Sequence, residues 1–202
     1  MRRSLNLSHD FQVTDPYLIP GYDCLRNNLG LTDPLTLDMS MGRIVALRDA
    51  QLRTSVLPGL YDLKHLQQFH QKLFVDVFDW AGEIRSIDLS KGIPFAFPHL
   101  IEVNASTLLA GLAAEKLLAG LDRVDFLERL TFYLGEVNAL HPFREGNGRT
   151  QRAFFRQLSA AAGWRVDWTG VTRQVNDQAS YESLVGRDTL LRTMLDGILS
   201  PL

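Results

Sequence analysis

The 202-residue sequence contains one cysteine, Cys24, and no apolar run approaches the ~20 residues of a membrane-spanning helix. A single cysteine excludes an intramolecular disulfide and suits a reducing compartment, and we expect a small buried thiol rather than a nucleophile. The basic start Met1-Arg2-Arg3-Ser4 is not followed by the long apolar stretch of a secretory signal. We therefore expect a cytoplasmic protein, or one delivered to the cytoplasm of a target cell, with no membrane partner.

The sequence also lacks an excess of either charge, because its formal net charge is −2. No global positive field would attract nucleic acid, so we expect no direct nucleic-acid binding. Hydrophobic residues make up 46% of the chain, which is enough for a sizeable core. Internal repeats, low-complexity runs and linkers are missing, and we therefore expect residues 1–202 to form a single domain.

Residues 1–31 are predicted to be an irregular N-terminal arm, with turns at Asp15-Pro16 and Pro20-Gly21 and a short helix over residues 23–29. Residues 32–202 are predicted to be a helical core. Apolar residues recur at helical spacing in seven stretches, over residues 33–52, 63–77, 98–118, 123–140, 153–162, 172–184 and 188–199. The fold class predicted from this pattern is all-α.

His65 and His70 lie on or beside the apolar face of the second of these helices. A metal pair on a helix is spaced four residues apart, whereas these two histidines are five apart. We therefore expect packed or surface histidines rather than a metal site.

The one strand signal is an alternating run, residues 84–89, followed by the turn Ser90-Lys91-Gly92 and a second extended run, residues 93–97. This pattern predicts a small β-hairpin at about residues 85–97. An isolated hairpin is marginally stable, so it must rest on helices, and Pro94 favours an edge position. Such an edge could pair with an extended segment of another protein. A hairpin without a binding role is the alternative.

Residues 141–152, His-Pro-Phe-Arg-Glu-Gly-Asn-Gly-Arg-Thr-Gln-Arg, lie between two predicted core helices. Gly146, Asn147 and Gly148 at a helix start would let backbone N–H groups converge on an anion, which suits phosphate. Arg149 and Arg152 are three residues apart and share a helix face, so both could reach one polyphosphate.

Two further residues of this stretch favour phosphate chemistry. Glu145 beside a phosphate site would repel the ligand unless a cation such as Mg²⁺ lay between them. His141 is the obvious general base near neutral pH. A structural Gly-Asn-Gly turn with a lone structural histidine is the alternative, but a base, an acid, an anion site and two arginines rarely occur together.

The stretch from His141 to Arg152 resembles the signature of Fic domain proteins, His-Pro-Phe-x-[Asp/Glu]-Gly-Asn-Gly-Arg-x-x-Arg, with every specified position filled. Residues 69–85 resemble the segment that leads into the flap of that family, and residues 15–21 resemble its N-terminal arm. The resemblance covers nearly the whole chain. It implies a Fic fold and the transfer of AMP from ATP to a Tyr, Ser or Thr hydroxyl of a target protein.

Carried over by position, the resemblance implies that His141 is the catalytic base and that Arg149 also neutralises the leaving pyrophosphate. Glu145 would hold Mg²⁺ between the α- and β-phosphates, and Phe143 would be structural. The hairpin would be the flap on which the target docks. The implied nucleotide-binding residues are Arg144, Glu145, Gly146, Asn147, Gly148, Arg149 and Arg152, and the implied flap residues are Lys91, Ile93, Pro94 and Phe95.

Many Fic proteins carry an inhibitory helix, [Ser/Thr]-x-x-x-Glu-[Gly/Asn], whose glutamate pairs with the second arginine of the signature. Neither Ser8, Thr14, Ser180 nor Thr189 is followed by glutamate four positions later. The chain thus resembles the class whose inhibitory helix comes from a small separate antitoxin. Toxins of this type resemble enzymes that modify type II topoisomerases, but nothing in the sequence names the target.

Other functions stay open at this point. A related transferase could use another nucleotide or a phosphate-containing donor, or could remove AMP. A catalytically silent helical binding module is a further alternative, although His141, Glu145 and Arg152 argue against it.

Overall fold

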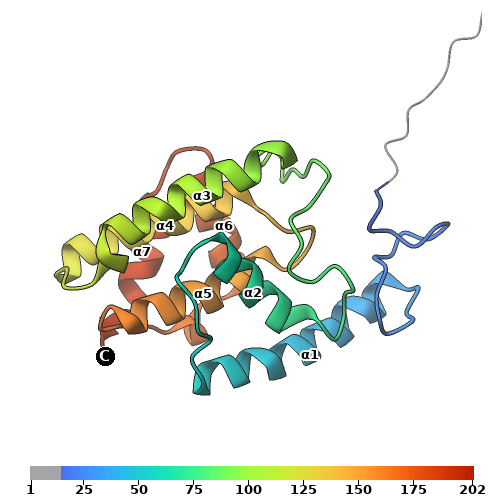
Figure 1. The fold of residues 1–202 in the computed structure, drawn as a ribbon, viewed down its shortest axis with the longest axis horizontal. Coiled ribbons are helices and arrows are strands. Elements are labelled where there is room, and N and C mark those ends of the chain that lie inside the picture. The colour runs from blue at the N-terminus through green and yellow to red at the C-terminus, as the bar shows by residue number, and fades with distance from the viewer. Residues whose placement is uncertain (1–14) are drawn as a thin grey trace, which may run out of the picture.

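The computed structural model describes residues 15–202 and is mostly helical, which confirms the predicted class (Figure 1). The basic start at residues 1–4 and the positions Ser8 and Thr14 lie outside the described residues. The bounds of the helices are α1 Pro34–Thr54, α2 Leu63–Phe74, α3 Pro98–Ala114, α4 Arg123–Leu140, α5 Asn147–Ala161, α6 Arg173–Leu184 and α7 Thr189–Ile198. Single turns of 3₁₀ helix lie at Lys116–Leu118 and Trp168–Gly170.

Side-chain caps explain where several helices begin. Asp33 accepts a hydrogen bond from the Thr36 amide, Asp62 accepts one from the His65 amide, and Asp122 accepts two at the start of α4. The helix predicted to extend to residue 77 ends at Phe74.

The core forms around α4 and α5, the two helices that flank residues 141–146. Helix α5 contacts both α2 and α4, while α3 and α7 contact α4 and α1 contacts α2. Figure 1 shows α1 along one side of the molecule and α3 along the opposite side, with α5 and α2 between them. The loop between α4 and α5 is therefore held by helices that each pack against several other elements.

The strands predicted for residues 84–89 and 93–97 are not formed. This segment turns back on itself as a loop, which we call the flap loop (residues 85–97), with one isolated bridge between Ser90 and Pro94. The buried Arg85 side chain explains the missing ladder, because its guanidinium binds the carbonyl groups of Ile87 and Ala96. Those carbonyls lie on the two limbs that would have paired.

The small two-stranded sheet lies elsewhere. β1 (Trp164–Val166) pairs antiparallel with β2 (Leu199–Pro201), so that Arg165 faces Ser200. The sequence pattern predicted a connector in place of β1 and a helix reaching Leu199. Three-residue strands are too short to show an alternation, and this pairing joins distant parts of the chain.

The helix predicted over residues 23–29 is also not formed, although the arm is irregular as predicted from residue 15 onward. The Asn27 side chain donates to the carbonyls of Leu25 and Leu31 and accepts from the amides of Leu29 and Leu31. Its amide group thus takes the place of helical hydrogen bonds, as asparagine does in turns.

Candidate active site

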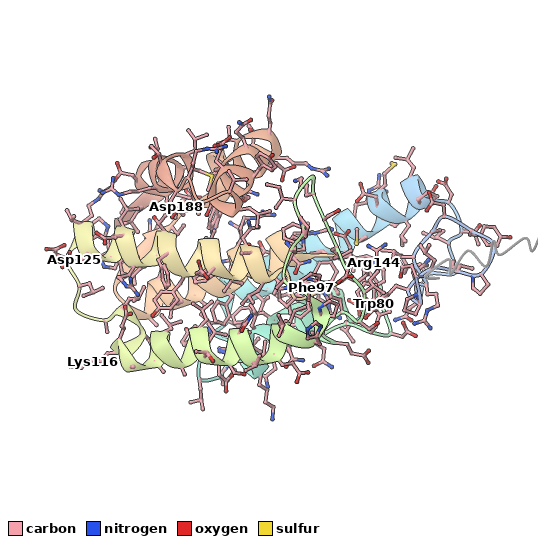
Figure 2. All side chains as sticks on the ribbon, turned by 90° about the horizontal axis from the view of Figure 1, so that it is seen from above. Trp80, Phe97, Lys116, Asp125, Arg144 and Asp188 are labelled. Atoms are coloured by element: carbon pink, nitrogen blue, oxygen red, sulfur yellow. The ribbon has the colours of Figure 1, made fainter. Side chains whose placement is uncertain are left out.

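The loop between α4 and α5 is bounded by two residues with left-handed backbone. His141 ends α4 with φ 45°, and Gly146 precedes α5 with φ 82°. A Cβ atom on Gly146 would lie 2.3 Å from Cζ of Phe74, so the position requires glycine on two grounds. Figure 2 places Arg144 of this loop at the same end of the molecule as Phe97, which ends the flap loop, and away from Lys116 and Asp125.

Asn147 holds the loop together through its side chain. Its Oδ1 accepts from the amide of Phe143 and its Nδ2 donates to the carbonyl of the same residue, at 2.9 Å and 2.7 Å. The asparagine was predicted to bind phosphate, but its buried side chain is fully engaged within the loop. Only its backbone N–H, at the uncapped start of α5, can therefore face a ligand.

His70 supports the same loop from α2. Its ring stacks on Phe143 with centroids 4.0 Å apart, its Nδ1 accepts from the amide of Gly82, and its Nε2 donates to the carbonyl of Glu145. Burial lowers the pKa of His70 to about 4, so the imidazole is neutral. The expectation of packed histidines is confirmed, because His65 is buried as well.

His141 lies beside the flap loop. The ring of Phe95 stacks on its imidazole with centroids 3.8 Å apart, and its Nδ1 lies 3.4 Å from the carbonyl oxygen of Asn138. Burial lowers the pKa of His141 to about 4, and the charges of Arg85 and Lys91 act in the same direction. The ring is therefore neutral at pH 7. With the proton on Nδ1, its Nε2 is free to accept another.

Arg149 and Arg152, the two arginines in the first half of α5, differ in their surroundings. Arg149 lies 3.2 Å from Oε1 of Glu145, and its guanidinium lies over the ring of Phe74. Arg152 forms neither an ion pair nor a side-chain hydrogen bond within residues 15–202, and burial lowers its pKa. An unpaired, largely buried cation is a strong attractor for an anionic ligand.

These groups line one cleft of about 700 Å³. The cleft brings together His141, residues 144–149 and Arg152, and α1 and α6 contribute Asp49 and Asp177 to it. A smaller adjoining pocket is lined by His141 and Arg152 with Lys91 and Phe95 of the flap loop. The flap residues Ile93 and Pro94 line neither of these two cavities.

Arg144 forms an ion pair within the protein, so its guanidinium is not free to bind only a ligand. Its guanidinium binds Oδ2 of Asp15 through Nε and NH2, at 2.9 Å and 2.8 Å. This ion pair ties the N-terminal arm to the loop of the site across 129 positions of sequence. No local signal in the sequence could have predicted it.

Several residues of the cleft were not predicted from the sequence, and Trp168, Asp177 and Asp49 are three of them. Trp168 lines both cavities, and its indole N–H is buried without a hydrogen-bond partner in the described residues. Asp177 of α6 lies 3.3 Å from Lys91 and so joins α6 to the flap loop. Asp49 pairs with Arg156 on α5. All three reach the site from elements distant in sequence.

The described residues contain no cluster of three or more histidine, cysteine, aspartate or glutamate side chains that could hold a metal ion alone. Glu145 is the one carboxylate in the loop, and its Oε1 accepts from the amide of Gly146 and from Arg149. Its other carboxylate oxygen has no hydrogen bond to any residue from 15 to 202. Such a site suits Mg²⁺, which binds one or two carboxylates together with phosphate oxygens of a substrate.

No helix within residues 15–202 is long and apolar enough to cross a lipid bilayer.

The sequence profile of the Fic/DOC family matches residues 60–159. Two curated relatives are similar over most of the chain. Protein adenylyltransferase VbhT of Bartonella schoenbuchensis is 41% identical over 90% of this chain, which spans only 38% of that protein. The probable protein adenylyltransferase Fic of Escherichia coli is 37% identical over 92% of both chains.

Solved structures are similar to the whole described fold. The BepC protein of Bartonella tribocorum, solved with bound AMPPNP, has a TM-score of 0.86 and 27% identity over 92% of this chain and 97% of that chain. The N-terminal Fic domain of a Bartonella quintana effector, solved with bound ADP, also has a TM-score of 0.86 and 27% identity, over 92% and 94%.

Proposed function

This chain belongs to the Fic/DOC family and is a protein adenylyltransferase, and we propose that it transfers AMP from ATP to a Tyr, Ser or Thr hydroxyl of a target protein. One observation supports the reaction most directly. Three features border one cleft: the neutral imidazole of His141, the guanidinium of Arg152, which has no ion-pair partner among the described residues, and the uncapped start of α5. A base and an anion site are thereby placed side by side.

In the proposed reaction, Nε2 of His141 takes the proton of the target hydroxyl as its oxygen bonds to the α-phosphorus of ATP. The bond from that phosphorus to the bridging oxygen breaks, and pyrophosphate leaves with both electrons of the bond. The N–H groups that begin α5 bind phosphate oxygens, and Arg149 and Arg152 neutralise the charge that develops on the leaving group. Catalysis of this kind depends on positioning and charge neutralisation.

Glu145 is the residue that would hold Mg²⁺, through the carboxylate oxygen that accepts no hydrogen bond from the described part of the chain. When bound, the ion would neutralise charge on the α- and β-phosphates and orient them. Binding of Mg²⁺ and of nucleotide should therefore depend on each other.

The target is proposed to dock on the flap loop beside His141. Phe95 already covers one face of the imidazole, and Lys91 lines the same pocket. Ile93 and Pro94 lie at the turn of the loop, where an extended segment of the target could run alongside. Because ATP is the donor, we place this reaction in the cytoplasm of the producing cell or of a cell that receives the protein.

The test uses the purified chain, α-labelled ATP, MgCl₂ and a bacterial lysate. Wild-type protein should label lysate proteins or itself, and His141→Ala should lower the labelling rate by about 100-fold or more. His99→Ala is the matched control, because His99 is exposed on α3 and should leave labelling unchanged. Incorporation from γ-labelled ATP, or equal labelling by His141→Ala, would contradict AMP transfer. Competition by unlabelled GTP, CTP or UTP reports whether another donor is preferred.

We propose further that the chain acts as the toxin of a toxin–antitoxin pair and is restrained by a small separate protein. Arg152, which has no partner within residues 15–202, would be the group that an inhibitory glutamate engages. The test co-expresses the chain with candidate small proteins encoded beside it. An inhibitor should suppress both growth arrest and labelling, and substitution of its glutamate by glycine should restore both. Full labelling in the presence of every neighbour would contradict this assignment.

A further inference from the structure

Arg85 is a buried cation with four hydrogen bonds at the start of the flap loop, and 2% of its surface is exposed. Its Nε donates to the carbonyl of His141 at 2.8 Å, and one terminal nitrogen reaches the carbonyl of Leu140 at 3.3 Å. Its terminal nitrogens also donate to the carbonyls of Ile87 and Ala96. One guanidinium therefore joins the end of α4 to both limbs of the flap loop.

The charge of Arg85 is compensated by carbonyl groups rather than by a carboxylate. No acidic side chain of residues 15–202 lies within ion-pair distance of it, and burial lowers its pKa. Two of the four carbonyls belong to the C-terminal end of α4, where the helix dipole favours a cation. A buried charge with a large desolvation cost thus lies where α4, the loop between α4 and α5, and the flap loop meet.

Backbone hydrogen bonds repeat the same connection. The amide of Arg85 donates to the carbonyl of Pro142 at 2.9 Å, and the amide of Ala96 donates to the carbonyl of Ala139 at 3.0 Å. Both limbs of the flap loop are therefore fixed to the chain on either side of His141. Phe95, the residue before Ala96, lies in consequence directly over the imidazole.

We propose that Arg85 is a positioning residue of the transfer reaction, which holds the His141 imidazole and the flap loop in register so that the base meets a target hydroxyl docked there. The proposal rests on the proposed function. Arg85 acts through His141 and the loop and touches neither substrate.

Arg85 contacts one part of the site, His141 and the flap loop, and not the other part, residues 145–152. None of its hydrogen bonds reaches residues 145–152, which would bind the nucleotide. Loss of the guanidinium should therefore slow transfer to protein while nucleotide affinity stays near that of the wild type. A residue that served the fold alone would weaken both together.

Two substitutions separate geometry from charge. Arg85→Gln removes the cation and most of the donors. Arg85→Lys keeps the cation, but an ammonium group has three donors on one atom and cannot span the separated carbonyls that a planar guanidinium reaches. Arg129→Gln is the matched control, because Arg129 also joins separated groups, Glu115 and Tyr133, but lies away from the site.

The experiment measures three quantities on each full-length variant. Calorimetry gives the affinity for AMPPNP with MgCl₂, thermal unfolding reports the fold, and α-labelled ATP gives the rate of AMP transfer to lysate protein and to the chain itself. Arg85→Gln should lower the transfer rate by about 100-fold, the scale expected when a reacting group is displaced by about 1 Å. AMPPNP affinity should stay unchanged, and Arg85→Lys should recover part of the rate.

A pH profile of the transfer rate adds a second readout. Besides Arg85, charged groups from the flap loop, α6, α5 and the loop before α5 share a cavity with His141. They include Lys91, Asp177, Arg152, Arg149, Glu145 and Arg144. With these unchanged, Arg85→Gln should move the acid limb of the profile to higher pH, because a neighbouring positive charge is lost. Arg85→Lys should return it.

Several outcomes would overturn the proposal. A folded Arg85→Gln protein with the wild-type transfer rate would do so, as would a parallel loss of AMPPNP affinity and transfer. If Arg85→Gln and Arg85→Lys both fail to fold, Arg85 serves the fold rather than the reaction. Wild-type protein that transfers no AMP would instead refute the proposed function.

Discussion

Gly146→Ala tests whether the backbone before α5 requires glycine for two independent reasons. Gly146 has φ 82°, a conformation that costs an alanine about 1–2 kcal/mol. Its new methyl group would also lie 2.3 Å from Cζ and 2.4 Å from Cε2 of Phe74. Phe74 is fully buried, so its ring cannot move into solvent.

The expected loss of stability is the sum of these two effects. Forcing an extra carbon into a filled core costs about 1–3 kcal/mol. The free energy of unfolding of Gly146→Ala should therefore fall by about 2–5 kcal/mol. For a domain of this size, each kcal/mol lowers the melting temperature by about 2–4 °C, so a loss of about 4–20 °C is expected.

Gly163→Ala is the matched control. Gly163 also has a positive φ, 90°, but a Cβ atom there would meet nothing within 4 Å. This variant should lose only the conformational part, about 1–2 kcal/mol. Urea unfolding followed by circular dichroism measures both values.

The two variants should also differ in nucleotide binding. The Phe74 ring lies under the guanidinium of Arg149, with the carbon of that group 5.1 Å from the ring centroid. A displaced ring therefore disturbs Arg149, and Gly146→Ala should bind AMPPNP more weakly than Gly163→Ala. Equal stability and equal affinity in the two variants would refute the close approach of Gly146 to Phe74.

Three further predictions concern the same loop. His70 is buried, and its pKa is lowered from 6.5 to about 4. Its contribution to the free energy of unfolding is therefore fully present above pH 6.5 and is lost as the pH falls toward 4. The total loss is about 3 kcal/mol. His70→Gln should thus lose less stability than the wild type between pH 7.5 and 4.5 in urea titrations, and an identical pH dependence would contradict the burial argument. Asn147→Ala leaves the buried N–H and C=O of Phe143 without their side-chain partner, so the free energy of unfolding should fall by about 2–4 kcal/mol. A loss below about 1 kcal/mol in urea unfolding would show that water replaces the amide. Phe95→Ala opens the imidazole of His141 to water, so its pKa should rise from about 4, and the acid limb of kcat/KM should move to higher pH. An unmoved limb in the pH–rate profile would contradict this.

Most helices could be predicted because their signals are local. Asp33, Asp62 and Asp122 cap helices whose apolar residues recur at the predicted spacing, and each cap involves residues at most three positions apart. The residues of the site from His141 to Arg152 are contiguous, so one turn and one helix start are enough to bring them together.

Two of the errors arose where a polar side chain competes with the backbone pairing that a pattern suggests. Alternation over residues 84–97 predicted strands, but the Arg85 guanidinium takes carbonyls of both limbs. Asn27 likewise replaces the helix predicted over residues 23–29. The spacing of apolar residues indicates which face of a segment is buried. It does not predict which backbone carbonyl a nearby side-chain N–H group will bind.

The sequence by itself determined the helical class, the helix starts and the set of groups that meet at the start of α5, because these depend on residues close together in the chain. Only the tertiary structure decided that Arg144 pairs with Asp15, that β1 pairs with β2, and that Arg85 is buried under His141. Each of these contacts joins segments far apart in sequence, so its partner is chosen by the folded packing and not by local spacing. The same packing buries the imidazole of His141 and leaves Arg152 without an ion-pair partner in residues 15–202, so that a neutral base and a free cation face the same cleft.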